Sequence, residues 1–264
     1  MDLEYCNVSN DEIIDVLYGN DNGAMGLGSR LGVPYMRAQK ESVAIKIPAG
    51  DGTLVDIAMH QSSMGLMAIS GVIWDCGLLM IDFLSQQCLI ESTPQDSKHH
   101  VCKPLGTVLE LGCGTGICGI SSVYLNATRV VLTDIMKTPT LDDNIDQLSP
   151  EFKTKTDFHL YAWGSAVPAA LDDITWDTVI GSDVLYDEHA HQPLLTTITQ
   201  LKFNRFYLSY KKRNNAKEQE FFKSLLRTNA YRVSIVANSG IQMLNMQANE
   251  ASDQGLYLMV IEPL

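Results

Sequence analysis

The stretch Val108-Leu-Glu-Leu-Gly-Cys-Gly-Thr-Gly-Ile-Cys-Gly119 decides the fold of this chain. An apolar run ends in a cluster of glycines, and a run of small residues typical of a helix follows. This order predicts a buried parallel strand, a tight turn and the start of a helix. Glycines lack a Cβ atom, so they adopt unusual φ angles and let a ligand lie directly on the backbone. The stretch therefore predicts a ligand site in an α/β fold.

Two classes of nucleotide cofactor fit this turn. The glycines at 114, 116 and 119 satisfy the dinucleotide pattern G-x-G-x-x-G. Glu110 distinguishes the two classes, because a carboxylate there disfavours a pyrophosphate and suits the amino group of a cationic ligand. Together with the tighter triplet Gly112, Gly114 and Gly116, it favours S-adenosylmethionine, a nucleoside with a sulfonium and an ammonium and no phosphate. A glycine turn that packs a helix on a sheet without any ligand is the alternative.

Composition indicates one large domain with a short extension. The chain has 264 residues, of which 45% are hydrophobic and 19% are charged, so a large core is expected. We expect an N-terminal extension over 1–70 and the main domain over 71–264. The net charge of −12 opposes nonspecific binding of nucleic acid.

The cysteines and the apolar runs indicate the compartment. The six cysteines form no C-x-x-C pair, which predicts a reduced protein without a disulfide framework. The longest apolar stretch, 71–84, is interrupted by Asp75 and Asp82 and is too short to span a bilayer. An acidic N-terminus does not resemble a signal peptide. We expect a cytoplasmic protein, or one shared with the nucleus, with no membrane partner.

Strand and helix patterns alternate along most of the chain. We expect a helix at 10–18, a loop at 19–32, a β-hairpin from 42–47 and 54–59, a helix at 73–84 with one apolar face and a surface connection at 86–103. We then expect strands at 107–111, 129–133, 158–161, 176–183, 205–210, 231–237 and 255–261, and helices at 117–126, 141–148, 191–201 and 216–229. This order predicts a doubly wound, mostly parallel seven-stranded sheet with a C-terminal antiparallel hairpin and an N-terminal β-hairpin extension.

Three acidic residues are expected at the carboxyl ends of strands, where such sheets bind ligands. They are Glu110, Asp134 and Asp183. Asp134 is placed to bind ribose hydroxyls. Asp183 ends a buried strand, and a buried carboxylate is costly without a partner. A substrate cation is one candidate partner, with the ring of Tyr186 beside it; the alternative is that Asp183 caps the next turn and Tyr186 packs.

Together these segments resemble the seven-β-strand methyltransferases, specifically the family-sixteen protein-lysine group. The resemblance covers about 70–262 and rests on Gly71-Val-Ile-Trp74-Asp75, Glu110-Leu-Gly112-Cys-Gly114-Thr-Gly116, Ala162-Trp163-Gly164 and Asp183-Val-Leu-Tyr186. It implies S-adenosylmethionine as the cofactor and catalytic roles for Asp183 and Tyr186. The cofactor contacts that it implies come from Trp74, Glu110, Gly112, Gly114, Gly116, Asp134, Trp163 and Ser182.

The expected activity is methylation of a lysine on another protein, by a monomer without a metal. Ser209-Tyr-Lys-Lys-Arg213 and Glu220-Phe-Phe222 resemble members that act on an elongation factor or an AAA ATPase. No proline follows Asp183 in the manner of enzymes that methylate base amino groups, so no nucleic-acid substrate is expected. His189 and His191 lack a matching metal-ligand cluster. The alternatives are a small-molecule methyltransferase, a non-catalytic interaction protein and a nicotinamide-dependent oxidoreductase.

Overall fold

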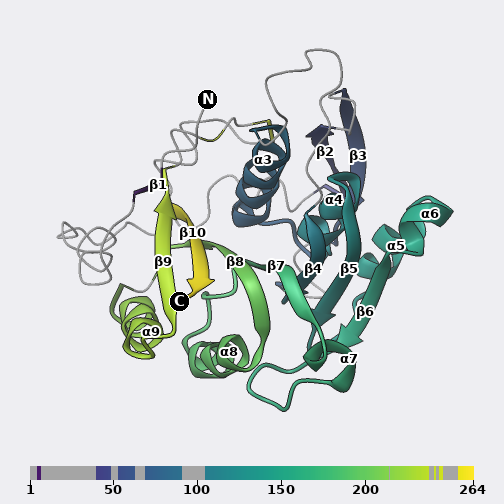
Figure 1. Ribbon diagram of the computed structural model, residues 1–264. Helices are drawn as coiled ribbons and strands as arrows, with labels where there is room; N and C mark the ends of the chain where they lie inside the picture. Colours follow the sequence, from purple (N-terminus) through teal and green to yellow (C-terminus); the bar gives the residue numbers. More distant parts are fainter. Residues whose placement is uncertain are drawn as a thin grey trace.

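Figure 1 shows the computed structural model of the chain. The described residues are 5–6, 40–48, 53–62, 69–90, 105–213, 215–237, 241, 244–245 and 255–264. The helix expected at 10–18 and the loop expected at 19–32 lie outside them.

An eight-stranded sheet forms the centre of the molecule (Figure 1). Its strands, in spatial order, are β1 (Tyr5–Cys6), β9 (Tyr231–Val236), β10 (Leu256–Pro263), β8 (Lys202–Lys211), β7 (Thr175–Ser182), β4 (Gly106–Leu111), β5 (Ala127–Asp134) and β6 (Thr156–Leu160). The pairs from β8 to β6 are parallel, whereas β10 runs antiparallel to both β8 and β9. The seven expected strands and the antiparallel C-terminal strand are therefore confirmed, and the two-residue β1 adds an edge strand.

Helices cover both faces of this sheet. They are α3 (Asp75–Ile90), α4 (Ile117–Tyr124), α5 (Pro139–Asp146), α6 (Pro150–Lys153), α7 (Ala169–Asp172), α8 (Glu188–Gln200) and α9 (Asn215–Arg227). Successive strand residues point to opposite faces. Thus Val108 packs into the core under α3 and α4, whereas Leu109 packs into the core under α8 and α9. The strands read as continuous apolar runs because both of their faces are buried.

The expected hairpin is confirmed as β2 (Ser42–Pro48) and β3 (Leu54–His60), which pair antiparallel. Its apolar side chains, such as Ile45 and Met59, belong to the same hydrophobic core as α3 and α4. Asn144 on α5 fixes one end of the hairpin, since it accepts from the His60 N–H at 2.7 Å and donates to the His60 carbonyl at 3.0 Å. The division of the chain at residue 70 stays a prediction.

Helix α3 differs from the sequence prediction in its length and its surroundings. It continues to Ile90, so the surface connection expected from residue 86 begins later. Cys88 explains the extra turn, because it is buried and its Sγ lies 3.6 Å from the Leu125 carbonyl oxygen. Nearly all of its described side chains are buried, and not those of one face only, because α4, strands of the central sheet and strand β2 of the hairpin all pack against it.

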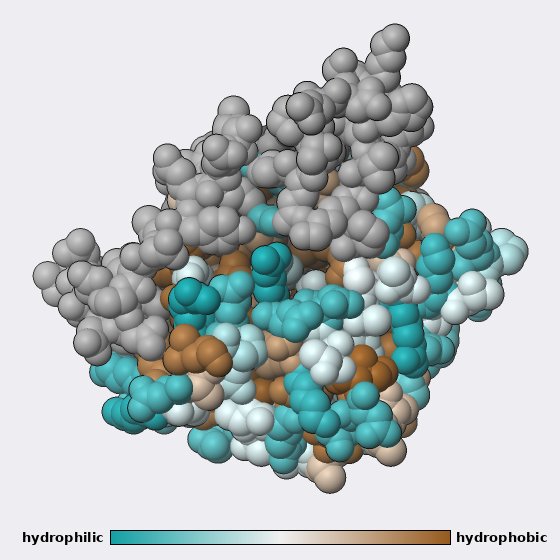
Figure 2. All heavy atoms as spheres, viewed as in Figure 1, coloured by the Kyte–Doolittle hydropathy of each residue, from teal (hydrophilic) through white to brown (hydrophobic). Residues whose placement is uncertain are grey.

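Two four-residue helices, α6 and α7, were not expected. A proline begins α6 directly after Ser149, whose hydroxyl accepts from the Phe152 N–H at 3.3 Å. Segments this short contain too few residues to display the periodicity on which helix prediction rests. The described surface facing the viewer in Figure 2 is largely hydrophilic, with hydrophobic residues dispersed among polar ones, as is normal for a solvent-facing surface.

Candidate active site

A cavity of about 370 Å³ opens at the carboxyl ends of β4, β5 and β7. This volume is in the range of small-molecule and cofactor sites. Its lining residues are Ile69, Ser70, Val72, Trp74, Gly77, Glu110, Gly112, Cys113, Gly114, Thr115, Ile117, Asp134, Ile135, Ala162, Trp163, Ser182, Asp183, Val184, Tyr186, Asp187, His189, Ala190 and Pro193. Nine of the ten site residues expected from the sequence are in this set, and Gly116 is not.

The glycine turn after β4 forms one wall of the cavity. Gly112 and Gly114 have φ angles of 69° and 52°, which glycine adopts without the strain that a Cβ atom would impose. A Cβ atom on Gly112 would lie 2.9 Å from Cζ2 of Trp163, and one on Gly114 would lie 3.0 Å from the Ser70 carbonyl oxygen. The turn is therefore closely packed by an aromatic ring on one side and by backbone on the other.

Gly116 contributes to the helix rather than to the cavity. It stands at the N-terminus of α4 with a φ of 77°, and a Cβ atom there would lie 2.6 Å from Cδ1 of Leu141. Glycine suits this position because its left-handed backbone disfavours other residues, and the side chain of Leu141 from α5 fills the space beside it.

Glu110 is a buried carboxylate beside the turn, with only 2% of its surface exposed. Its Oε2 accepts a hydrogen bond from the N–H of Gly119 in α4 at 2.8 Å. Burial raises the pKa of the Glu110 carboxyl to about 8, because the hydrogen bond from Gly119 offsets only part of the lost hydration. A cation bound beside Glu110 would favour its ionised form.

Asp134 ends β5 and reaches the same cavity. Its Oδ2 accepts from the N–H of Gly114 at 2.9 Å, and its Oδ1 accepts from the N–H of Ile135 at 2.7 Å. A carboxylate has about four lone-pair positions, so acceptor capacity remains for hydroxyl groups of a ligand.

Two indoles line the cavity near the glycine turn. Trp74 lies just before α3, and its Nε1–H donates to the carbonyl oxygen of Ile69 at 3.0 Å. Trp163 packs against Gly112, and the neighbouring Gly164 N–H is held by the Thr197 hydroxyl at 3.0 Å. Both rings are partly buried and line the cavity, where they offer flat apolar surfaces.

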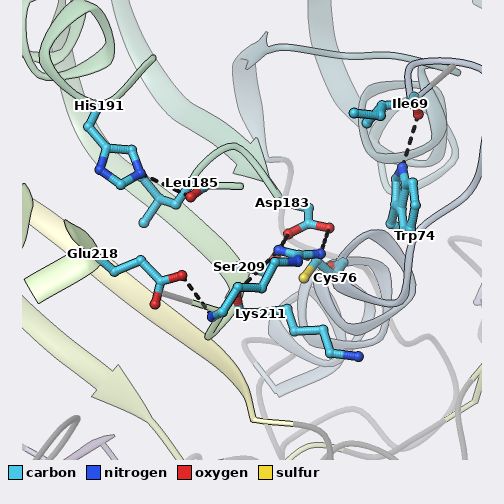
Figure 3. Close-up of polar contacts among 10 residues, drawn as sticks. Ile69, Trp74, Cys76, Asp183, Leu185, His191, Ser209, Lys211 and Glu218 are labelled. Carbon is cyan, nitrogen blue, oxygen red and sulfur yellow. Dashed lines mark hydrogen bonds and ion pairs between the residues drawn. The ribbon is translucent and has the colours of Figure 1, made fainter. Parts of the chain in front are cut away.

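Asp183 follows β7 and has a left-handed backbone with a φ of 55°. Its N–H donates to the Ser209 carbonyl at 2.8 Å, which holds this strained residue in place. Its side chain is 7% exposed and accepts from Nη1 and Nη2 of Arg213 at 2.6 Å and 2.7 Å. In Figure 3 the guanidinium that meets the labelled Asp183 carboxylate is that of Arg213.

The sequence left two interpretations of Asp183 open, a substrate cation as its partner or a cap on the next turn. The structure adds a partner from the protein itself, Arg213. Arg213 ends a run of three basic residues that begins at Lys211, a pattern typical of a solvent-exposed surface, but it turns inward and its side chain is only 30% exposed. The reason is electrostatic: a buried carboxylate at the end of β7 requires a compensating charge.

Tyr186 lies at the mouth of the cavity. It is 47% exposed, so its ring is shared between the cavity and solvent. Partial burial raises the pKa of its hydroxyl, with a smaller contribution from nearby carboxylates, so the hydroxyl stays protonated near neutral pH. Tyr186 therefore presents a neutral aromatic ring to whatever enters the cavity.

Sequence reasoning missed several lining residues. His189 and Pro193, both from α8, line the cavity. Ile69 and Ser70 come from the segment before Trp74. Their positions depend on how α3 and α8 dock on the sheet, and no local pattern in the sequence signals that docking.

Other kinds of site are not indicated in the part of the chain that the structure describes. No cluster of three or more His, Cys, Asp or Glu side chains there has the geometry to hold a metal ion. No helix among these residues has the length and apolar character needed to cross a membrane. Cys76, Cys88, Cys113 and Cys118 are buried free thiols.

Comparisons with known proteins give the family of the chain. A family model described as lysine methyltransferase matches residues 55–228. A UPF0665 family protein of Schizosaccharomyces pombe is 32% identical over 45% of this chain and 37% of its own length. Protein N-lysine methyltransferase METTL21A of Xenopus tropicalis is 24% identical over 51% of this chain and 56% of its own length. EEF1A lysine methyltransferase 3 of Mus musculus is 26% identical over 65% of this chain and 68% of its own length.

The chain thus spans 37% of the length of the first of these relatives and 56% of the length of the second. The match to the family model covers more than half of the chain. It includes strands β4, β5 and β7, whose carboxyl ends line the cavity. The chain belongs to the lysine methyltransferase family.

Proposed function

We propose that this chain binds S-adenosylmethionine in the cavity and directs its methyl group to the side-chain amine of a lysine on another protein. The observation that carries the proposal is the convergence of Glu110, Asp134 and Asp183 on one cavity beside a glycine turn. Carboxylates attract cationic groups and accept hydrogen bonds from hydroxyls, whereas they repel the negative charge of a pyrophosphate. Membership of the lysine methyltransferase family supports the same conclusion.

The residues present fit this cofactor. Glu110 would face the amino group, since its carboxyl is buried beside the turn and an ammonium there would offset the burial that raises its pKa to about 8. Asp134 would accept from ribose hydroxyls, and Trp74 and Trp163 would offer ring faces. Gly112 and Gly114 would shape the turn along which the cofactor lies, and Ser182 at the end of β7 lines the same cavity. When bound, the cofactor supplies an electrophilic methyl group on a sulfonium.

Asp183 and Tyr186 would receive the acceptor amine. A free lysine has a pKa of about 10.4, so at neutral pH nearly all of it is ammonium and cannot attack. The site must therefore hold the amine after its proton has left for solvent and keep it aligned. Asp183 would accept an N–H of the amine, and the ring of Tyr186 at the mouth would exclude water from it.

A cytosolic protein is the proposed substrate, with an elongation factor or an AAA ATPase as the first candidates, for an enzyme in the cytoplasm or the nucleus. The similarity of 209–213 and 220–222 to members with such substrates supports this choice, and a mouse relative is named for an elongation factor. The net charge of −12 would favour the approach of a basic, lysine-bearing surface.

Labelling of a cell extract tests the proposal. Purified wild-type protein and the Gly112→Val variant are each incubated with extract and with cofactor labelled in its methyl group. We expect a discrete labelled protein band with the wild type and none with the variant. Label confined to small molecules would move the acceptor to another class, and the absence of any label despite cofactor binding would contradict the proposal.

Cofactor binding is expected to release protons from Glu110. At pH 7 a carboxyl with a pKa of about 8 is mostly protonated, and pairing with an ammonium group would ionise it. The affinity for S-adenosylhomocysteine should therefore increase as the pH is raised toward 8 and level off above it. Calorimetry in buffers of different ionisation enthalpy should give a release of nearly one proton at pH 7. Glu110→Gln should remove this release, and an equal release in that variant would exclude the role.

Asp134→Ala is expected to weaken cofactor binding by about 2–3 kcal/mol, because charge-assisted hydrogen bonds to ribose hydroxyls are lost. Part of the loss will come from the turn, since Asp134 also accepts from the Gly114 N–H. Asp134→Asn keeps one acceptor oxygen and should lose less. Titration calorimetry with S-adenosylhomocysteine measures both variants, and wild-type affinity in Asp134→Ala would argue against ribose contacts from this residue.

A further inference from the structure

The Asp183–Arg213 ion pair lies at the cavity. Asp183 lines the cavity, and both of its oxygens meet the guanidinium of Arg213 (Figure 3). The two donors come from one planar group, so the contact is bidentate and fixes the orientation of the carboxylate. Arg213 itself is not among the lining residues, so it acts on the cavity through Asp183.

Arg213 is held in this position by two elements. Its backbone N–H donates to Oε1 of Glu218 on α9 at 2.8 Å, and its Nη1 also donates to the Lys211 carbonyl at the end of β8 at 3.2 Å. Burial by itself lowers the pKa of Arg213, but the hydrogen bonds and charge of Asp183 more than offset this and raise it above its ordinary value. The guanidinium is therefore a permanent, anchored positive charge.

The other groups that face Asp183 do not replace this charge. Cys76 on α3 lies against it (Figure 3), and burial, followed by the charge of Asp183, raises the pKa of this thiol far above its ordinary value. Cys76 is therefore a neutral thiol. Asp75, on the same helix, is acidic, as are Asp134 and Asp187 at the cavity. Among the described residues, Arg213 is the cation that pairs with the Asp183 carboxylate, whereas His189 and Lys211 make no ion pair with it.

Compensation matters because of what an acceptor lysine must do. An uncompensated carboxylate attracts an ammonium group and raises its pKa, but an ammonium has no lone pair with which to attack. A carboxylate paired with a guanidinium exerts much less of this effect. It still has unused lone-pair positions, since Arg213 occupies two of about four, and these can accept an N–H of a neutral amine.

We propose that Arg213 is a positioning residue that compensates the charge of Asp183, so that the acceptor site selects the neutral amine of lysine over its ammonium form. The inference rests on the proposed function, because it assigns Asp183 to the acceptor. It predicts that changing Arg213 alters the charge preference of the site, and not merely its stability.

Sinefungin tests this without a protein substrate. It is a cofactor analogue that carries an amine in place of the sulfonium methyl group, so it places a cation where donor and acceptor meet. The measured quantity is the ratio of its affinity to that of S-adenosylhomocysteine, by calorimetry at pH 7.5. Because S-adenosylhomocysteine lacks this amine, the ratio cancels general damage to the cavity.

Removing the positive charge of the pair and removing its negative charge should change this affinity ratio in opposite directions. Arg213→Met leaves the carboxylate unpaired and should raise it about tenfold, whereas Asp183→Asn leaves the guanidinium unpaired and should lower it about tenfold. Asparagine suits the test because it tolerates the left-handed backbone. Arg213→Lys keeps the charge and should restore a ratio near that of the wild type. Arg227→Met removes a solvent-exposed pair with Glu220 and should leave it unchanged.

Each outcome decides the inference. A ratio for Arg213→Met within twofold of the wild type, with S-adenosylhomocysteine still bound, would overturn it. If Arg213→Met does not fold, Asp183→Asn decides, and an unchanged or increased ratio there overturns it equally. If the wild type binds neither ligand, the proposed function has failed and the inference falls with it.

Discussion

Replacing Asp183 by alanine is expected to lower the rate of methyl transfer by at least about a hundredfold, because the acceptor amine would lose the group that orients it. Affinity for S-adenosylmethionine should also fall relative to S-adenosylhomocysteine, since the unpaired guanidinium of Arg213 would repel the sulfonium. Initial rates with the labelled acceptor protein and calorimetry with both ligands measure these effects.

The same substitution should reduce the free energy of unfolding by about 1–3 kcal/mol, the cost of removing the partner of a hydrogen-bonded charge. The side chain of Arg213 is 30% exposed, so it can recover some hydration and the larger penalty of a fully buried charge does not apply. Arg227→Met is the matched control for a surface ion pair and should cost less than about 1 kcal/mol. Transfer at the wild-type rate by Asp183→Ala would remove Asp183 from the mechanism.

Replacing Gly112 by valine is expected to abolish cofactor binding and to destabilise the protein by several kcal/mol. A β-branched residue at a φ of 69° is strained by about 1–2 kcal/mol. The new side chain would also overlap Trp163, since its Cβ alone would lie 2.9 Å from the indole. Displacement of that ring would close the cavity from the turn side. Titration with S-adenosylhomocysteine and thermal unfolding measure the two effects.

Gly255→Val is the matched control, because Gly255 has a φ of 64° and stands at the start of β10, outside the cavity lining. It should show the backbone strain without a loss of cofactor affinity. Cofactor affinity near that of the wild type in Gly112→Val would mean that the ligand does not lie on this turn.

Patterns local in the sequence predicted most of the fold and much of the site. The strands β4, β5 and β7 are mostly apolar and each carries an acidic residue at or next to its carboxyl end, so the pattern indicates both the strand and the end that faces the ligand. Parallel strands bring these ends to one edge, which is why Glu110, Asp134 and Asp183 share a cavity although they are far apart in the chain.

Features that depend on tertiary packing were not predictable in this way. Arg213 is 30 residues from Asp183 and belongs to a basic run typical of a solvent-exposed surface. Its side chain can reach Asp183 because β8 lies beside β7. The extra turn of α3 depends on burial of Cys88 against Leu125. Gly116 fitted a cofactor motif, yet it contacts Leu141, because the sequence does not reveal which glycine faces the ligand and which faces a helix.

The central claim is that the cavity directs a methyl group to a lysine side chain, and the chemical identity of the methylated residue tests it most directly. The protein labelled by the wild-type enzyme in extract would be hydrolysed to amino acids, and the labelled product would be compared with methylated standards. The account predicts label in Nε-methylated lysine, with none from a reaction that contains Asp183→Ala. Label in methylated arginine, in a base-labile carboxyl ester or in no protein at all would contradict it.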